Sequence, residues 1–308
     1  MTKNISCVVL GANGFIGTNL VQKLIQAGSK VTGFARQDSN IFLKDIEWVK
    51  GDFSNQDAIR NAIKGKEIVY HLIDNAIPAA ITKANQLLTN ISDTINLLDI
   101  CVKEDVRKII YISSGGTVYG ITNNQPINEK ISTNPICSYG INKLASEKYI
   151  HLYHHLHKLD YAIVRLSNPF GPHQNTLKPQ GIIATLIANF LMNKTTKIWG
   201  DGEIIRDYIY VDDVVDGLIQ LIDHSGSTKI FNLGSGIGRS INQIIFDLEK
   251  IIGQRKINVD YINSTRPIDV PVNILDTRLI QKHINWNIKI DWYDALKLTI
   301  DWMKNHKS

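Results

Sequence analysis

The chain has 308 residues, 44% of them hydrophobic and 20% charged, with 34 Lys and Arg residues against 29 Asp and Glu residues. A chain of this length forms one large domain or two, and its hydrophobic fraction excludes a disordered protein. No apolar run approaches the ~20 residues of a membrane-spanning helix. The basic residues form no block or basic–aromatic stripe, so we expect neither a membrane nor a nucleic acid as partner.

The cysteines and the N-terminus indicate the compartment. Cys7, Cys101 and Cys137 are odd in number, far apart and absent from any CxxC pair. Neither a disulfide framework nor a metal site is therefore expected. The apolar stretch at 5–10 is too short for a signal peptide. These features predict a cytoplasmic protein.

Strand-like and helix-like segments alternate through the first half of the chain. Strands are expected at 5–10, 30–34, 46–49, 67–72, 108–113 and 161–166, and helices at 15–27, 56–63, 82–102 and 139–157. Strands separated by helices of this length imply right-handed βαβ crossovers and a parallel sheet covered on both faces. The sequence therefore predicts an α/β fold of the Rossmann type with a doubly wound parallel sheet.

The regular alternation fades after Asn168, where glycine and proline turns interrupt the elements. We expect a first domain over 1–168 and a smaller, mixed region over 169–308, with a segment at about 204–240 returning to the first domain. The sequence shows no internal repeat and no flexible linker.

A glycine-rich turn joins the first expected strand to the first expected helix. Its glycines are Gly11, Gly14 and Gly17, and it includes Asn13, Phe15 and Ile16. Such a turn needs residues without a Cβ, and the following helix N-terminus supplies free N–H groups and positive dipole for a dinucleotide pyrophosphate. The spacing is GxxGxxG rather than GxGxxG, so an ordinary glycine-rich turn is the alternative.

The end of the second expected strand distinguishes the two nicotinamide cofactors. An acidic residue there holds a ribose hydroxyl, whereas an arginine accommodates a 2′-phosphate. Ala35 stands at the acidic position and Arg36 follows it. This favours NADP(H), with NAD(H) possible if Arg36 is only a solvated loop charge. Asp52 could accept a hydrogen bond from the adenine amino group or could cap its own loop.

Tyr139 and Lys143 lie four residues apart on an expected helix and therefore share one face. A tyrosine with an ordinary pKa near ~10 exchanges protons poorly at neutral pH unless a cation favours its phenolate. Lys143 would be that cation. The alternative is an ordinary helix surface, and the presence of a phosphate-binding turn in the same sequence argues against it.

These motifs together resemble the extended short-chain dehydrogenase/reductase family, in its branch of nucleotide-sugar 4-epimerases, 4,6-dehydratases and 4-ketoreductases. The resemblance covers nearly the whole chain and includes the turn at Gly11, Tyr139-x-x-x-Lys143, Asn168-Pro169-Phe170-Gly171-Pro172, Arg206-Asp207-Tyr208 and Asn232-Leu233-Gly234. It implies an NAD(P)-binding Rossmann domain and a small domain for a nucleoside-diphosphate sugar. It also implies cofactor contacts at Phe53, Leu72 and Asn90.

The resemblance extends to the substrate. It implies that Asn168 contacts the phosphate or sugar region and that Arg206 and Arg266 hold the diphosphate. A guanidinium group suits this role because its planar fork matches phosphate oxygens and stays charged. An interdomain salt bridge for Arg206 and a surface charge for Arg266 are the alternatives.

Two departures from the family pattern narrow the reaction. Gly115 stands where most relatives carry a catalytic Ser or Thr, so Thr117, or Ser114, would have to supply the hydroxyl; Thr117 is favoured. The dehydratases carry an Asp-Glu pair where this chain has Gly116 and Thr117, which argues against dehydration. Ile73-Asp74 also replaces the small alanines that are usual beside the cofactor.

The cofactor preference favours reduction of the C4 keto group of a nucleotide-linked 4-keto-6-deoxyhexose, such as a dTDP sugar for lipopolysaccharide O-antigen. Tyr139 would protonate the emerging alkoxide. The alternative is an NAD-dependent UDP-hexose 4-epimerase, and a more distant one is a non-catalytic NADP(H) sensor. By analogy with relatives, we expect a homodimer that pairs the helices at 82–102 and 139–157.

Overall fold

The computed structural model describes residues 4–37, 43, 46–74, 84–176, 181–253, 255–263 and 270–306, with the backbone alone for 84–90. The larger lobe is built on a sheet of seven parallel strands in the order β10-β6-β5-β4-β1-β2-β3. Their bounds are β1 Ser6–Leu10, β2 Lys30–Ala35, β3 Glu47–Lys50, β4 Ile68–His71, β5 Lys108–Ser114, β6 Asp160–Leu166 and β10 Ile230–Leu233.

Side chains alternate between the two faces of this sheet. In β1, Val9 faces a core that includes helix α1, whereas Val8 faces the core on the opposite side. In β5, Ile110 and Ile109 divide in the same way. Both faces are therefore buried, as a parallel sheet requires, and the predicted doubly wound α/β fold is confirmed.

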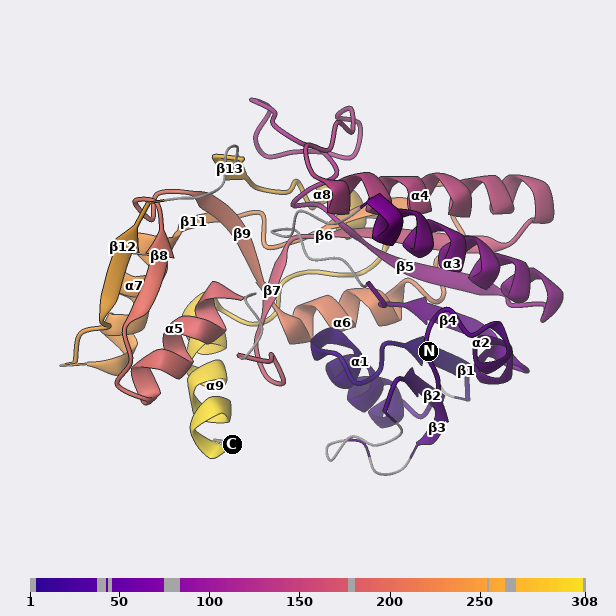
Figure 1. Cartoon of the computed structure of the whole chain (residues 1–308), viewed down its shortest axis with the longest axis horizontal. Helices are drawn as coiled ribbons and strands as arrows, with labels where there is room; N and C mark the ends of the chain where they lie inside the picture. The colour runs from indigo at the N-terminus through magenta and orange to yellow at the C-terminus, as the bar shows by residue number, and fades with distance from the viewer. Residues whose placement is uncertain are drawn as a thin grey trace.

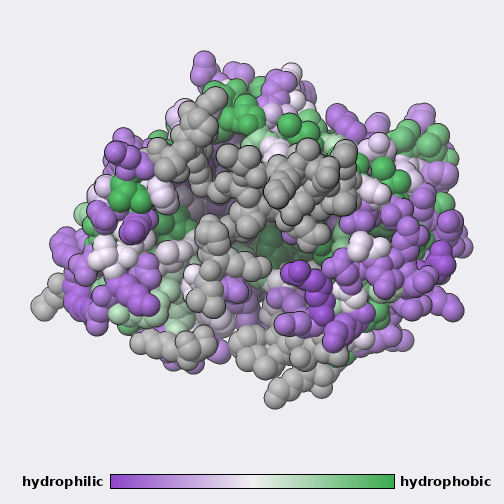
Figure 2. Space-filling view, in the orientation of Figure 1, coloured by the Kyte–Doolittle hydropathy of each residue, from purple (hydrophilic) through white to green (hydrophobic). Residues whose placement is uncertain are grey.

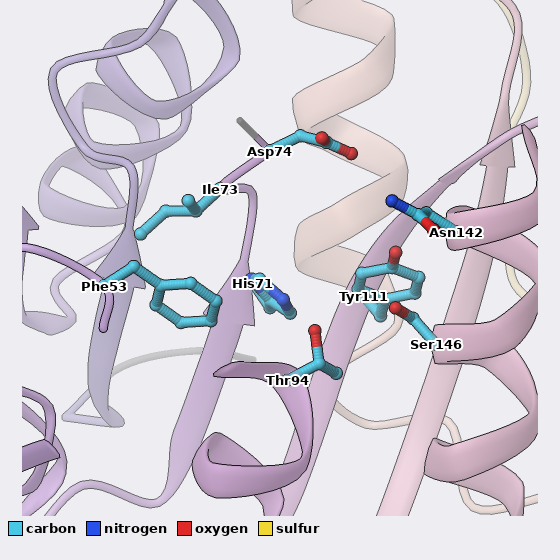
Figure 3. Close-up of a pocket in the computed structure, with 8 residues that line it drawn as sticks. All are labelled: Phe53, His71, Ile73, Asp74, Thr94, Tyr111, Asn142 and Ser146. Atoms are coloured by element: carbon cyan, nitrogen blue, oxygen red, sulfur yellow. The ribbon is translucent and has the colours of Figure 1, made fainter. Parts of the chain in front are cut away.

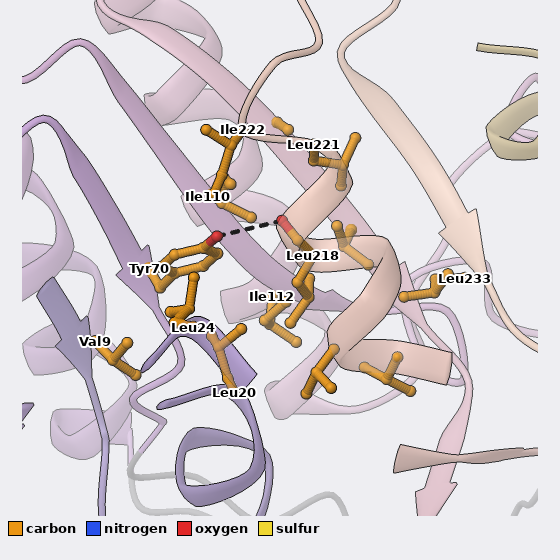
Figure 4. Close-up of a cluster of buried hydrophobic side chains, with 14 of the residues drawn as sticks. Val9, Leu20, Leu24, Tyr70, Ile110, Ile112, Leu218, Leu221, Ile222 and Leu233 are labelled. Atoms are coloured by element: carbon orange, nitrogen blue, oxygen red, sulfur yellow. Dashed lines mark hydrogen bonds between the residues drawn. The ribbon is translucent and has the colours of Figure 1, made fainter. Parts of the chain in front are cut away.

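Helices cover both faces of the sheet. One face carries α1 (Phe15–Gln26), α6 (Val211–Gln220) and α8 (Arg278–His283), and the other carries α2 (Gln56–Ile63), α3 (Ala84–Lys103) and α4 (Ser138–His157). Figure 4 shows the first of these cores, where the Tyr70 hydroxyl of β4 donates a hydrogen bond to the Leu218 carbonyl of α6 at 3.4 Å. Each helix thus buries its apolar side against a β-rich surface.

The chain reverses its direction of travel across the sheet between β1 and β4. It runs from β1 to β2 and β3 on one side, then returns to β4 and continues to β5 and β6 on the other. The loops that follow β1 and β4 therefore diverge at the carboxyl ends of these two strands. Open parallel sheets bind ligands in the crevice between such loops, at a switch point of this kind.

The smaller lobe lies to one side of the sheet and contains the C-terminus (Figure 1). It holds two small sheets, with strands β7 Asn168–Phe170, β9 Ile205–Tyr210, β11 Gly238–Ser240 and β13 Val272–Asn273 in one and β8 Thr196–Trp199 and β12 Val259–Ile262 in the other. Its helices are α5 Ile182–Leu191, α7 Ile241–Ile252 and α9 Trp292–Asn305. Its core is separate from the two cores of the large lobe.

The segment expected to return to the first domain, at about 204–240, has contacts in both lobes. Its strand Ile205–Tyr210 pairs with β7, β11 and β13 in the smaller lobe, while Ile209 of the same strand lies in the large core. Val211 and Val214 of α6 follow in the large core, and the segment reaches β10 at the sheet edge. Ile280 of α8 joins the same core from later in the chain. Hydrophobic pattern alone does not show which of two sheets a short strand joins.

The face of the molecule in Figure 2 is mostly hydrophilic, with hydrophobic groups in small patches. No helix in the described ranges is long and apolar enough to cross a bilayer. Within the same ranges, no group of three or more His, Cys, Asp or Glu side chains could hold a metal ion.

Candidate nucleotide-sugar site

The glycine turn is packed so closely that side chains cannot enter it. A Cβ on Gly17 would lie 2.2 Å from the Gly11 carbonyl oxygen, and one on Gly14 would lie 3.1 Å from the same atom. Gly11 itself has φ of +94°, a conformation that favours glycine. Helix α1 begins at Gly14 without a side-chain cap, so its first N–H groups point out of the helix end. This geometry fits a dinucleotide pyrophosphate.

Within the described part of the chain, Asn13 leaves one polar atom of the glycine turn without a partner. The Asn13 amide donates to the Gln37 carbonyl at 3.0 Å, while its Oδ1 is buried without a hydrogen-bond partner among the described residues. Phe15 and Ile16 are half-buried at the start of α1. An orphaned buried oxygen beside the turn is consistent with a ligand that supplies its partner.

The end of β2 presents Arg36 at the surface, close to Asp52. Asp52 accepts hydrogen bonds from the backbone N–H and the hydroxyl of Ser54, which lower the pKa of its carboxyl, and Arg36 acts in the same direction. Arg36 and Asp52 therefore follow the neighbouring strands β2 and β3, and their charges interact.

Helix α4 brings Tyr139 and Lys143 to the carboxyl end of β5. The Lys143 ammonium donates to the Ile112 carbonyl at 2.7 Å and lies 5.7 Å from the centre of the Tyr139 ring. It also lies 4.9 Å from the Tyr111 ring. The lysine is buried and the tyrosine half-buried, so their interaction is little screened by solvent.

Burial and charge act on this pair in opposite directions. Burial raises the pKa of the Tyr139 phenol to about 12, and the Lys143 ammonium counteracts it. Burial also disfavours the ammonium, but Tyr111, Asp74 and Tyr139 together raise the pKa of Lys143 above its usual range. Lys143 therefore stays charged at neutral pH and is the group that favours a phenolate at Tyr139.

Packing just after β5 accounts for the glycine at position 115, where the family pattern has a Ser or Thr hydroxyl. A Cβ on Gly115 would lie 2.5 Å from Cδ1 of Leu275, so a side chain there would have to displace a core residue. Thr117 lies beside the start of α4, since a Cβ on Gly140 would lie 2.8 Å from its carbonyl oxygen. The Thr117 hydroxyl is buried without a hydrogen-bond partner among the described residues, whereas Ser114 is half-buried at the end of β5.

A small cavity of about 20 Å³ is lined by Asp74 and Tyr111, which both contact Lys143 (Figure 3). Its lining comes from β4, β5, α3, α4 and the loop after β3, and consists of Phe53, His71, Ile73, Asp74, Thr94, Tyr111, Asn142 and Ser146. Burial lowers the pKa of His71 to about 3, with Lys143 acting in the same direction, so this histidine is neutral. Leu72 follows His71 and its backbone contacts Gly11.

Two of the predicted substrate residues, Asn168 and Arg206, lie in the small sheet of the second lobe. Asn168 of β7 donates to the Asp207 carbonyl of β9 at 2.9 Å, next to Arg206. Arg206 is paired in register with Arg239 of β11, and the Arg239 guanidinium lies 3.9 Å from the Trp292 ring. The charges of Asp247 and Asp207 also act on Arg239. The two arginines lie on paired strands of the sheet that holds Asn168.

Two predicted residues lie outside the described part of the chain. The side chain of Asn90 is not described, although the helix α3 that carries it is. Arg266 falls within 264–269.

Three functional candidates come together only through the fold and were not predicted from the sequence. Tyr111 faces Lys143 from β5, Arg239 opposes Arg206 across two strands, and Asp74 pairs with Lys143. For Asp74 there was a signal, because a carboxylate directly after a central parallel strand lies at the ligand-binding edge of the sheet.

Residues 7–234 match the model of a family described as the NAD dependent epimerase/dehydratase family. This span includes the glycine turn, Tyr139, Lys143 and Arg206. The chain belongs to that family. The predicted resemblance to nucleotide-sugar 4-epimerases and reductases is thereby confirmed.

Relatives match over nearly their whole length. The UDP-glucose 4-epimerase of Mycolicibacterium smegmatis is 28% identical over 97% of this chain and 98% of its own. The crystal structure of the Thermotoga maritima UDP-glucose 4-epimerase with UDP-glucose is 31% identical, covers 98% of this chain and 99% of that one, and has a TM-score of 0.91. The dTDP-4-dehydro-6-deoxyglucose reductase of Escherichia coli is 28% identical over 91% of each chain.

Proposed function

We propose that the protein is an NAD-dependent 4-epimerase of a UDP-hexose. The observation that supports this best is the intact Tyr139–Lys143 pair at the switch point of a chain whose full-length relatives include UDP-glucose 4-epimerases. The sequence alone favoured a 4-ketoreductase and kept epimerisation as the alternative, and the comparisons now favour that alternative.

The proposed chemistry assigns each group a distinct task. Tyr139 would take the proton from the 4-hydroxyl of the hexose and return it after the sugar has turned over. Lys143 would favour the phenolate that this exchange requires, and Thr117 would hold the 4-oxygen through its orphaned hydroxyl. Bound NAD would supply reversible hydride transfer at C4. No carboxylate stands at positions 116 and 117, as a dehydratase of this branch would need.

The second lobe would hold the nucleotide. Arg206 and Arg266 would bind the diphosphate, and Asn168 would lie at its sugar end. The position of Arg206 beside Asn168 in one small sheet supports this assignment, because a guanidinium group binds phosphate oxygens through paired hydrogen bonds. Arg239, which pairs in register with Arg206, is an additional candidate that the sequence did not indicate.

We propose NAD rather than NADP as the resident cofactor, against the preference that Ala35-Arg36 gave. The glycine turn, Asn13, Asp52, Phe53, Leu72 and Lys143 would contact it. Arg36 lies near the Asp52 carboxylate, so its charge is partly answered within the chain and does not require a 2′-phosphate. The family description as NAD dependent supports the same choice.

One experiment separates the two reactions. Purified protein is denatured to release bound nucleotide, and intact protein is incubated in parallel with UDP-glucose or with dTDP-4-keto-6-deoxyglucose plus NADH or NADPH. An epimerase releases stoichiometric NAD and forms UDP-galactose, seen by proton NMR, without net loss of reduced cofactor. Stoichiometric oxidation of NADPH by the keto sugar would instead establish the reductase. Tyr139→Phe should abolish whichever activity is found.

We also propose that two copies pair through the α3–α4 face. On α4, Ile141, Leu152 and Leu156 are exposed by 53%, 44% and 60%. Their spacing of eleven and four residues places them on one side of the helix. A second copy would cover these side chains.

A further inference from the structure

Asp74 places a negative charge against the lysine of the candidate site. Its Oδ2 lies 3.0 Å from the Lys143 ammonium, and the two side chains are only 20% and 4% exposed. The ammonium also donates to the Ile112 carbonyl, so it is fixed between the ends of β4 and β5. An ion pair held this far from solvent is weakly screened and acts strongly on its neighbours.

The other ionisable groups around Lys143 cannot replace this carboxylate. From β4, His71 is neutral, and from β5, Tyr111 presents its ring and a phenol whose pKa is raised by burial, so the phenol is uncharged at neutral pH. On α4 itself, Tyr139 lies one turn away, and Glu147 is engaged by Arg165 and Ser113. Within the described ranges, Asp74 is the carboxylate that forms an ion pair with Lys143.

The cavity beside the pair is about the size of one water molecule, and Asp74, Asn142 and Ser146 are among the polar residues of its lining. Figure 3 shows the Asp74 carboxylate and the Asn142 amide facing each other across it. The Asn142 Nδ2 is buried without a partner among the described residues. A neutral Asn at position 74 can therefore be accommodated with a water molecule, so charge can be removed here without emptying an apolar core.

We propose that Asp74 is a positioning residue that fixes the Lys143 ammonium beside Tyr139 and offsets part of its charge, and thereby sets the pH at which Tyr139 becomes a proton acceptor. The inference rests on the proposed function, which needs Tyr139 as phenolate. Lys143 lowers the pKa of Tyr139, and the charge of Asp74 raises it. The family pattern has small residues at this place, so Asp74 would tune this chain in particular.

The test measures the pH dependence of UDP-glucose turnover by the holoenzyme carrying Asp74→Asn. Because the phenolate is the active form, kcat rises with pH, and removing the Asp74 charge should move this rise about one pH unit lower. KM should change less than twofold, since Asp74 is not assigned to substrate. Asp74→Glu should restore the wild-type profile.

Asp216→Asn is the matched control, because Asp216 is 17% exposed and pairs with Lys23 at 2.6 Å on the opposite face of the sheet. Its pH profile should equal that of the wild type. An unshifted Asp74→Asn profile, or an equal shift in the control, would overturn the proposal.

A second readout separates this inference from the proposed function. Tyr139 ionisation is followed at 295 nm as the difference between each protein and the same protein carrying Tyr139→Phe. The Tyr139 signal should begin about one pH unit lower with Asp74→Asn than with Asp74. A wild-type enzyme that epimerises nothing would refute the proposed function, whereas an unchanged titration would refute the role of Asp74.

Discussion

A buried hydroxyl with no partner is rare in folded proteins, and among the described residues that of Thr117 has none. The Thr117 backbone lies against Gly140, the residue after Tyr139. Leaving such a group unpaired costs about 1–3 kcal/mol, so a ligand that accepts or donates there recovers that cost. Gly115 has no hydroxyl, and a side chain there would meet Leu275, because a Cβ would lie 2.5 Å from its Cδ1. Thr117 is therefore the residue of choice for contact with the sugar 4-oxygen.

Replacing Thr117 by Val tests this assignment. The loss of one hydrogen bond to a developing charge should lower kcat by about 10²-fold, while the folded protein becomes no less stable because no hydrogen bond is lost in it. Thr117→Ser should retain most activity. Steady-state kinetics with thermal melts measure both effects. A larger loss with Ser114→Ala than with Thr117→Val would assign the hydroxyl to Ser114 instead.

Single residues show where prediction from sequence ended. Tyr139 and Lys143 were predictable because their spacing on one helix already fixes a shared face. The Asp74–Lys143 pair was not, because 69 positions separate its members and only the adjacency of β4 and β5 joins them. The reason for Gly115 was equally hidden, since its neighbour Leu275 comes from the end of the chain.

Among the elements, the turn between β1 and α1 has little room for side chains, because its glycines pack against the backbone of Gly11. Gly17→Ala would place a Cβ 2.2 Å from the Gly11 carbonyl oxygen, whereas Gly14→Ala would place one at 3.1 Å. Because the Gly11 backbone has to move in the first case, we expect Gly17→Ala to lose bound dinucleotide. Gly14→Ala should lose affinity to a smaller degree. Isothermal titration with NAD ranks the variants, and equal affinities would show that this turn does not cradle the cofactor.

Helix α4 is anchored to the sheet by a buried ion pair. Glu147 accepts two hydrogen bonds from the Arg165 guanidinium of β6, at 2.7 and 3.1 Å, and both side chains are almost fully buried. Glu147→Ala leaves Arg165 charged and unpaired, which should cost about 3–5 kcal/mol. Urea unfolding measures the loss.

Glu104→Ala is the control for this loss. The exposed pair between Arg60 and Glu104 has a separation of 3.9 Å, so its removal should cost less than about 1 kcal/mol. Equal losses in the two variants would show that α4 does not depend on the Glu147 pair.

The elements themselves were largely predictable. The helix Gln56–Ile63 has the predicted bounds. Its periodic apolar face indicates a helix, and Asn55 caps its first turn and so indicates where it begins. Strand ends shifted by about a residue, as with Lys30–Ala35 in place of 30–34. The pairing of the strand Ile205–Tyr210 in the small sheet was not predictable, because its partners β7, β11 and β13 are short and distant in sequence.

At the scale of the whole molecule, two lobes share one chain that crosses between them repeatedly. The return of α6, β10 and α8 to the large lobe ties the lobe with Arg206 to the lobe with Tyr139. The candidate substrate and cofactor residues thus belong to units held together by continuous chain. Hydrophobic periodicity predicted the large lobe, but it could not predict these crossings.

The exposed apolar side of α4 is the feature that a single copy leaves unexplained. We expect the wild-type protein to be a dimer in solution and the double variant Leu152→Glu, Leu156→Glu to be a monomer, because four buried carboxylates in one symmetric interface would repel one another. Light scattering coupled to gel filtration measures the mass. Leu298→Glu, at a position 46% exposed on α9 in the other lobe, should remain dimeric. A monomeric wild type, or dissociation of the control as well, would show that the α4 face is not the interface.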